Sequence, residues 1–312
     1  MTDTERLFYL VGQYGYPAVF LFLVGLLATA LAFYLAYRWV ASHRTWLVGC
    51  TRAALSYPLV ARLRERYDRQ LRWLLRRLTP GEYLGLHLTV GLLLAVGCLW
   101  FFGDLAEDVV TNDQLVRFDQ AVAIALHRSA TPALTSFFFV VTVMGSGEVL
   151  ALLGLIATAI FGLRRRWLHV GTWLAALAGG AVLNQLLKEL FARPRPSFAD
   201  PWLSETSYSF PSGHAMLSLV VYGVLAYFAV LALQTWRART AVVFGVALLV
   251  VLIGVSRMYL GAHYFSDVLA GFAAGGVWLS TLITGLETIR RRRNDEPLGR
   301  TTRAGHVHRQ RH

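Results

Sequence analysis

Long apolar segments recur along the 312-residue chain and are separated by short polar segments. Each apolar segment holds about the 20 residues that a helix needs to cross a bilayer, so we expect seven membrane-spanning helices. The expected spans are residues 16–38, 84–103, 146–163, 168–190, 213–234, 240–260 and 264–286. The hydropathy pattern therefore predicts an all-α integral membrane protein, and we divide it into residues 1–80, a core at 81–290 and a disordered cytoplasmic tail at 291–312.

The composition agrees with a membrane protein and disfavours a soluble enzyme. Hydrophobic residues make up 56% of the chain and charged residues only 15%, whereas about a quarter of the residues of soluble domains are charged. The net charge of +12 alone would suggest a nucleic-acid partner. However, the arginines cluster between alternate spans and no recognition fold is evident, so we expect no nucleic-acid binding.

The distribution of arginine predicts the orientation in the membrane. Residues 38–80 contain ten arginines and two acids, and further basic clusters lie at 164–166, 237–239 and 290–293. Residues 104–131 contain five acids and two arginines. Because basic loops stay in the cytoplasm, we expect a multi-pass protein of the cytoplasmic (inner) membrane with its amino terminus outside and its carboxyl terminus in the cytoplasm.

Residues 51–78 have apolar side chains at steps of three and four, with arginines on the opposite face. Such a basic amphipathic helix beside a span is typical of a helix that lies against anionic lipids. Docking of a partner protein is the alternative. We therefore expect residues 1–80 to supply an extra transmembrane helix and a basic interfacial helix.

Three polar clusters interrupt the apolar spans, and the predicted topology places all of them at the extracytoplasmic face. They are Lys188–Pro196, Pro211–His214 and Ser256–Asp267. Each cluster alone has a structural explanation, such as a lysine that snorkels to the interface or a serine that caps a helix. Ionisable residues within spans are costly and mark function, so their coincidence at one membrane depth predicts a single site.

The clusters combine the groups that bind a phosphate. Lys188, Arg195 and Arg257 offer three cations, and a guanidinium can hold phosphate oxygens bidentately. Ser212 and Gly213 open a predicted helix, whose amino terminus attracts anions. The two cysteines, Cys50 and Cys98, lack metal-ligand spacing. The sequence therefore predicts a phosphate site that needs no metal.

Two histidines are candidates for the chemistry at this site. His263 and Asp267 are four residues apart, so on a helix they share a face. The carboxylate can then orient the imidazole and make its other nitrogen more nucleophilic. His214 comes from a different helix and can protonate the leaving oxygen.

The spacings Lys-x6-Arg-Pro, Pro-Ser-Gly-His and Ser-Arg-x5-His-x3-Asp occur here in this order. In this combination the chain resembles the type 2 phosphatidic acid phosphatase superfamily, which includes lipid phosphate phosphatases. The resemblance covers roughly residues 84–288, and Phe118–Gly147 is similar to a segment of its bacterial members. Residues 1–80 are not part of the family's usual core.

The resemblance implies a six-helix core that hydrolyses phosphate esters or diphosphates through a phosphohistidine, with no metal or other cofactor. It implies His263 as the nucleophile, Asp267 as its orienting partner and His214 as the acid. The groups that it implies for phosphate binding are Lys188, Arg195, Ser212, Gly213 and Arg257.

We therefore expect a membrane phosphatase that acts on a lipid phosphate or diphosphate at the extracytoplasmic face. Polyprenyl diphosphate, phosphatidylglycerol phosphate and phosphatidic acid are the expected substrates. One alternative is a phosphotransferase, in which a lipid or sugar hydroxyl takes the phosphoryl group instead of water. Another is a transporter or lipid-binding membrane protein without catalysis.

Overall fold

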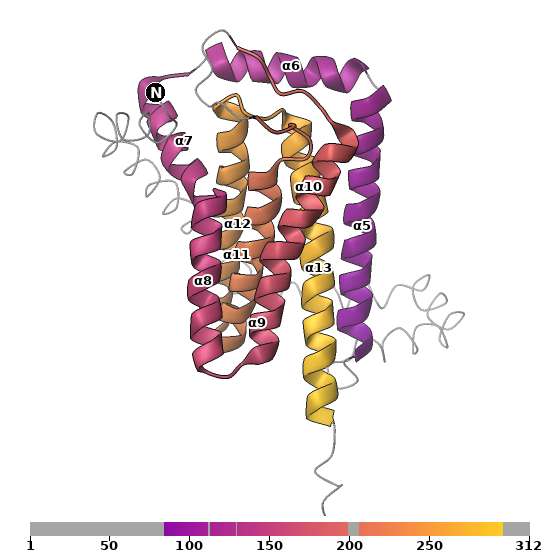
Figure 1. Cartoon of the computed structure of the whole chain (residues 1–312), viewed down its shortest axis with the longest axis vertical. Coiled ribbons are helices and arrows are strands. Elements are labelled where there is room, and N and C mark those ends of the chain that lie inside the picture. Colours follow the sequence, from indigo (N-terminus) through magenta and orange to yellow (C-terminus); the bar gives the residue numbers. More distant parts are fainter. Residues whose placement is uncertain (1–83, 112, 129, 199–205, 296–312) are drawn as a thin grey trace, which may run out of the picture.

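A computed structural model describes residues 84–111, 113–128, 130–198 and 206–295 (Figure 1). These residues form helices and connecting turns, and no strand occurs among them. The expected span 16–38, the basic helix 51–78 and tail residues 296–312 lie outside the described part of the chain.

Six segments of the described residues are long and apolar enough to cross a membrane. They are Leu88–Thr111, Pro132–Leu163, Trp167–Phe191, Gly213–Ala232, Trp236–Tyr259 and Phe265–Arg290. The prediction of an all-α membrane protein with a six-span core is therefore confirmed.

The described residues form ten helical elements, of which all but α6 belong to the spans. These are α5 (Leu84–Thr111), α6 (Asp113–Arg128), α7 (Pro132–Met144), α8 (Gly147–Leu163), α9 (Trp167–Leu174), the π-helix η1 (Ala175–Gly179), α10 (Gly180–Phe191), α11 (Gly213–Ala232), α12 (Trp236–Tyr259) and α13 (Phe265–Asp295). Helix α13 thus continues past residue 290, the boundary drawn from the sequence, because the arginines that follow are good helix formers.

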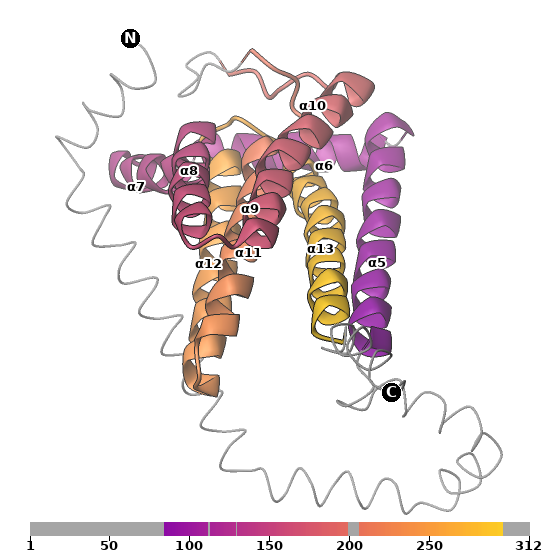
Figure 2. The same ribbon diagram turned by 60° about the horizontal axis from the view of Figure 1, so that its bottom comes forward.

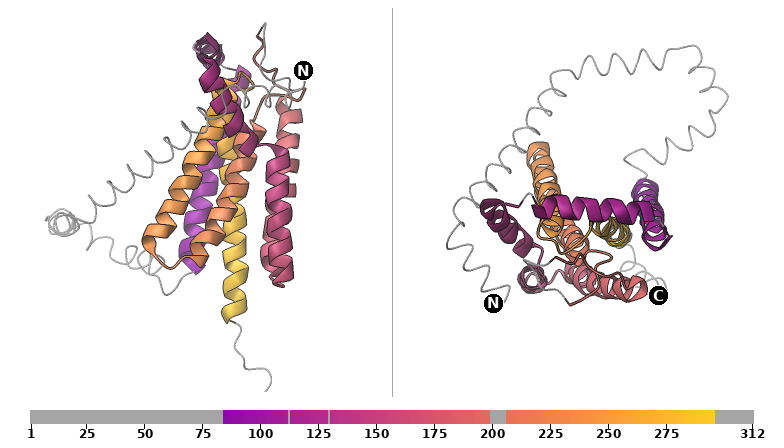
Figure 3. Two further views of the ribbon diagram at one scale, coloured as in Figure 1. Left: turned by 90° about the vertical axis from the view of Figure 1, so that its left-hand side faces the viewer. Right: turned by 90° about the horizontal axis from the view of Figure 1, so that it is seen from above.

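Two helices occupy a region in which the sequence pattern predicted no span. Helix α6 lies across one end of the bundle, from α5 toward α7 (Figures 1 and 3). It exposes Phe118 and Ile124 and buries Asp119 and Ala123, so it is amphipathic and suits the membrane interface. Helix α7 precedes the expected span 146–163, and Ser146 caps α8 by accepting a hydrogen bond from the Val149 amide at 3.3 Å.

The expected span 168–190 is interrupted by η1. The indole of Trp278 in α13 donates a hydrogen bond to the Ala175 carbonyl at 3.2 Å, and Gly179 has no side chain that would clash with this ring. A π-turn frees a carbonyl within a helix. Here it allows α13 to pack closely against the α9–α10 span.

Helices α11 and α13 pack closely at the end of the bundle near α6. A Cβ atom at Gly271 would lie 2.7 Å from the Ser212 carbonyl oxygen, and one at Gly275 would lie 2.9 Å from the Met216 carbonyl oxygen. Only glycine permits this approach. The starts of α11 and α13 therefore meet where α10 and α12 end (Figure 1), and the three polar clusters come from these four helix ends.

Candidate active site

The three polar clusters predicted from the sequence meet beneath α6. The backbone amide of Ser209 donates to the Arg193 carbonyl at 2.9 Å, and that of Ser212 donates to the Asp267 carbonyl at 2.9 Å. Arg195 Nη1 donates to the Ala262 carbonyl at 2.8 Å. Hydrogen bonds therefore link the first cluster to the third and to the segment just before the second, and they link the second cluster to the third.

His263 and Asp267 are neighbours, but a turn brings them together and not a shared helix face. The sequence suggested that they share a helix face, but His263 lies in the turn before α13, which begins at Phe265. Asp267 Oδ2 accepts the amide of Tyr264 at 2.8 Å, as a carboxylate in the first turn of a helix often does. The turn places His263 Nδ1 3.6 Å from the same oxygen, which is an ion-pair distance.

The contact of His263 with Arg195 indicates which imidazole nitrogen carries the lone pair. Arg195 Nη1 lies 3.1 Å from His263 Nε2, and a guanidinium only donates hydrogen bonds. Nε2 is therefore the acceptor, and the neutral ring carries its proton on Nδ1, toward Asp267. This is the tautomer that a nucleophilic Nε2 requires.

Lys188 and Arg195 are held side by side by Ser207. The Ser207 hydroxyl oxygen accepts from Lys188 Nζ at 2.8 Å and from Arg195 Nη2 at 2.9 Å. Arg195 Nε also donates to the Ser207 carbonyl at 2.6 Å. Two cations are thus fixed beside His263 Nε2, and a phosphoryl group bound by Arg195 would lie at that nitrogen.

His214 and Arg257 approach the same place from α11 and α12. His214 lies within electrostatic reach of Arg257, His263, Lys188 and Arg195. Arg257 is 2% exposed. The predicted cations and both predicted histidines therefore belong to one site.

Residues of α7 and the following turn support His214 and Arg257. Arg257 Nη1 donates to Thr142 Oγ1 at 3.0 Å. A Cβ atom at Gly145 would lie 3.3 Å from His214 Cδ2 and 2.5 Å from the Ile253 side chain. The α7–α8 turn thus packs against the His214 ring, with a glycine at the point of closest approach.

The start of α11 has the features of an anion-binding helix terminus. Ser212 is buried and caps the helix by accepting from the Ala215 amide at 3.5 Å. Gly213 leaves room for Asn184, whose Oδ1 would lie 2.9 Å from a Cβ atom there. Asn184 Nδ2 also donates to the Pro211 carbonyl at 3.5 Å. A side chain of α10 therefore fixes the turn that carries Ser212 and Gly213.

A buried charge network lies behind His263, and the sequence analysis missed it. Arg193 donates to Asp267 Oδ1 at 2.6 Å and to Ser266 Oγ at 2.8 Å through Nη1, and to Asp119 Oδ2 at 2.8 Å through Nη2. Asp119 also accepts from the Ser266 amide at 3.0 Å and from its hydroxyl. Both carboxylates are fully buried and Arg193 is 8% exposed.

The electrostatics of this network keep Arg193 charged. Burial alone disfavours the guanidinium ion, but the carboxylates of Asp267 and Asp119 outweigh burial and raise the pKa of Arg193 above its ordinary value. The guanidinium also lies 4.4 Å from the centre of the Tyr264 ring. For Tyr264, by contrast, burial itself raises the pKa, and the charge of Arg193 opposes this shift. Arg193 therefore connects α6 to the carboxylate beside His263.

The structure thus adds supporting residues to the predicted set. Arg193 stands in the first motif, but its separation from both carboxylates along the chain hides its role. Asp119 falls within the segment Phe118–Gly147, and that likeness was the only signal for it. Thr142 lies in the same segment, and nothing in the sequence pointed to Asn184 or Ser207.

Comparisons with known proteins found a matching family and several related phosphatases. The family described as the PAP2 superfamily matches residues 169–291. Phosphatidylglycerophosphatase B of Bacillus subtilis is 36% identical over 194 residues, which are 62% of this chain and 94% of that protein. A lipid A 1-phosphatase of Rhizobium etli is 35% identical over 37% of this chain and 49% of its own length, so the chain spans about half of that relative.

A solved structure has the same fold as the described core. It is the crystal structure of a transmembrane PAP2 type phosphatidylglycerolphosphate phosphatase from Bacillus subtilis, matched with a TM-score of 0.58 and 32% sequence identity. The match covers 63% of this chain and 98% of that one.

Proposed function

Because this chain belongs to the PAP2 superfamily and is a membrane-embedded lipid phosphatase, we propose that His263 is its nucleophile. In this proposal a phosphohistidine forms and is hydrolysed without a metal ion. The observation that carries the proposal is the position of His263 Nε2, 3.1 Å from Arg195, on a ring whose Nδ1 faces Asp267.

The reaction has two steps. First, His263 Nε2 attacks the phosphorus atom, and the bond to the lipid oxygen breaks while His214 donates a proton to that oxygen. In the second step His214 takes a proton from water, and the resulting hydroxide attacks the phosphorus. Phosphate leaves, and the Nε2 lone pair of His263 is restored.

The cations replace the charge that a metal ion would supply. Lys188, Arg195 and Arg257 bind the phosphoryl oxygens, together with the amide end of α11 at Ser212 and Gly213. Donors that are fixed before the reaction stabilise the charge that develops in the transition state. Ser207 and Thr142 contribute by holding these cations in place.

We further propose that the site faces the extracytoplasmic side of the cytoplasmic membrane. Three arginine clusters lie at span ends. The cluster at 164–166 follows α8, that at 237–239 lies in the first turn of α12, and that at 290–293 begins where the last span ends. These positions lie at the end of the bundle opposite α6 (Figure 1). The positive-inside rule assigns that end and the carboxyl terminus to the cytoplasm.

A substrate with its phosphate at the interface and its chains in the bilayer fits this position. Phosphatidylglycerol phosphate is the first choice, because the alignment covers 94% of the relative named phosphatidylglycerophosphatase B. A polyprenyl diphosphate is the second, since an undecaprenyl-diphosphatase of Sulfolobus acidocaldarius is 31% identical over 42% of this chain. Phosphatidic acid offers the same phosphomonoester to the site.

The proposal is tested by phosphate release from these lipids by the purified full chain in the presence of EDTA. We expect turnover in EDTA, and its loss in His263→Ala without loss of folding, measured by thermal unfolding. The matched control is His169→Gln, because His169 lies in α9 at the other end of the bundle. A strict need for a divalent metal, or full turnover by His263→Ala, would refute the mechanism.

A further inference from the structure

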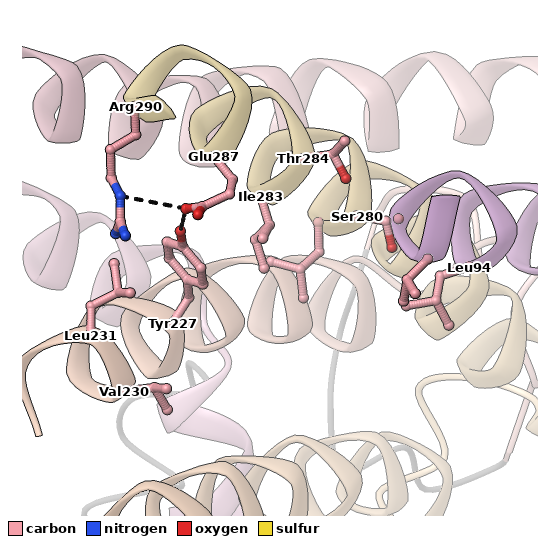
Figure 4. A pocket seen from close by; sticks show the side chains of 12 residues that line it. Leu94, Tyr227, Val230, Leu231, Ser280, Ile283, Thr284, Glu287 and Arg290 are labelled. Carbon is pink, nitrogen blue, oxygen red and sulfur yellow. Dashed lines mark hydrogen bonds and ion pairs between the residues drawn. The ribbon is translucent and has the colours of Figure 1, made fainter. Parts of the chain in front are cut away.

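A cavity lies at the end of the bundle opposite the phosphate site. It has a volume of about 530 Å³ and is lined by residues of α5, α11 and α13. Pockets of roughly 300–1,000 Å³ are typical of sites for small molecules. Figure 4 shows Leu94, Val230 and Ile283 on its walls. The inside of the cavity is therefore largely apolar.

The cavity exists because α11 and α13 pack closely only in one half of their length. At Gly271 and Gly275 the two backbones almost touch. Further along, the larger side chains Tyr227 and Leu279 line the cavity. Helix α5 instead stays against α13, where Gly91 lies beside Thr284. Figure 2 shows the α11–α12 pair separated from the α5–α13 pair at this end.

A polar group closes the outer end of this cavity. The Tyr227 hydroxyl donates to Glu287 Oε2 at 2.7 Å, and Arg290 Nε lies 3.5 Å from the same oxygen. Glu287 is 6% exposed, whereas the Arg290 side chain is 40% exposed. In Figure 4 the terminal nitrogens of Arg290 extend beyond Glu287 toward Leu231. Glu287 thus orients Nε, and the Nη donors face the outer end.

We propose that this cavity binds a phospholipid of the adjacent leaflet, with an acyl chain between α5, α11 and α13 and an anionic headgroup on Arg290. The last apolar span ends at Arg290, so Arg290 lies at the membrane depth of the lipid phosphates. A guanidinium oriented through Nε can hold phosphate oxygens with its two Nη groups. Below this cation the walls are apolar, as an acyl chain requires.

This lipid site is independent of the proposed catalysis. His263 and His214 lie at the other end of α11 and α13, so a lipid bound here touches no group of the phosphate site. Lipid retention can therefore be measured on an inactive enzyme.

The test uses the full chain in nanodiscs of equal parts phosphatidylcholine and phosphatidylglycerol, with the retained lipid counted by native mass spectrometry. We expect one phosphatidylglycerol to be retained by the wild-type chain and by His263→Ala. Ser280→Trp fills the cavity and should abolish retention. Its matched control is Thr281→Trp, because Thr281 is exposed one residue further along α13.

The role of Arg290 is tested in the same experiment. Phosphatidylglycerol is net anionic, whereas the choline cation of phosphatidylcholine is repelled by Arg290, so loss of this charge in Arg290→Gln should reduce the preference for phosphatidylglycerol about tenfold. The control Arg164→Gln removes an exposed arginine of the same end and should leave the preference unchanged. Equal retention by Ser280→Trp and Thr281→Trp would overturn the proposal. So would a dimer that only Ser280→Trp dissociates, because the cavity would then bind a second copy.

Discussion

Replacement of Asp119 by asparagine tests whether the network behind His263 supports the reaction. Asp119 lies in α6 and, by the proposed mechanism, touches neither substrate nor nucleophile. Its two oxygens accept from Arg193 and from the amide and hydroxyl of Ser266. Asparagine keeps the size of the side chain but offers one acceptor oxygen and an amide donor. One of the existing donors therefore loses its acceptor, and Arg193 loses half of its negative partners.

The size of the effect follows from these contacts. A hydrogen bond to a charged group contributes about 1.5–3 kcal/mol, and truncating one partner of a buried ion pair costs about 3–5 kcal/mol. Since asparagine retains part of the hydrogen bonding, we expect a loss of about 2–3 kcal/mol in the free energy of unfolding. Arg193 also donates to Asp267 at 2.6 Å, so a shift of Arg193 displaces the carboxylate beside His263.

The expected kinetic result is a lower kcat at nearly unchanged KM. Small displacements of catalytic groups can cost up to about a hundredfold in rate, and we expect a loss of about ten- to a hundredfold for Asp119→Asn. Phosphate release and thermal unfolding are measured on the same preparation. Asp104→Asn is the control because Asp104 is an exposed carboxylate of the neighbouring α5. If both variants match the wild type in kcat and stability, α6 does not position the site through Arg193.

Two further substitutions test packing and phosphate binding. Gly271→Ala should destabilise the protein by about 1–3 kcal/mol in thermal unfolding, because its Cβ would meet the backbone of α11 at 2.7 Å; Gly97→Ala, with open space around it, should be neutral or stabilising. Thr142→Val should raise KM about tenfold at unchanged fold, because Arg257 loses its hydroxyl partner at 3.0 Å. In Thr158→Val the lost hydroxyl has no partner among the described residues, so KM should not change. An unaltered KM in Thr142→Val would show that Thr142 does not hold Arg257 in place for phosphate binding.

The spans and the signature residues could be predicted from the sequence because their signals are local. A span needs about 20 consecutive apolar residues, which a hydropathy pattern shows directly. The motif residues also lie at helix ends, where short runs such as Pro211–His214 interrupt the apolar pattern. Six of the seven expected spans lie in the described residues, and each has a matching helix there.

Contacts between distant segments could not be predicted in this way. Arg193 meets Asp119 and Asp267 across 74 residues in each direction, and no local pattern records such a partner. The same limit applies to the pairing of His263 with Asp267, which depends on a turn rather than on a helix face.

The sequence by itself determined that this chain crosses a membrane and carries the phosphatase motifs. Tertiary structure decided which charges face one another. In a low-dielectric interior the energy of a charge depends on the few groups within a few ångströms of it, and packing such as that at Gly271 and Gly275 sets those distances. For the same reason the cavity near Arg290 is visible only in the fold, because it forms where two helices stop packing closely.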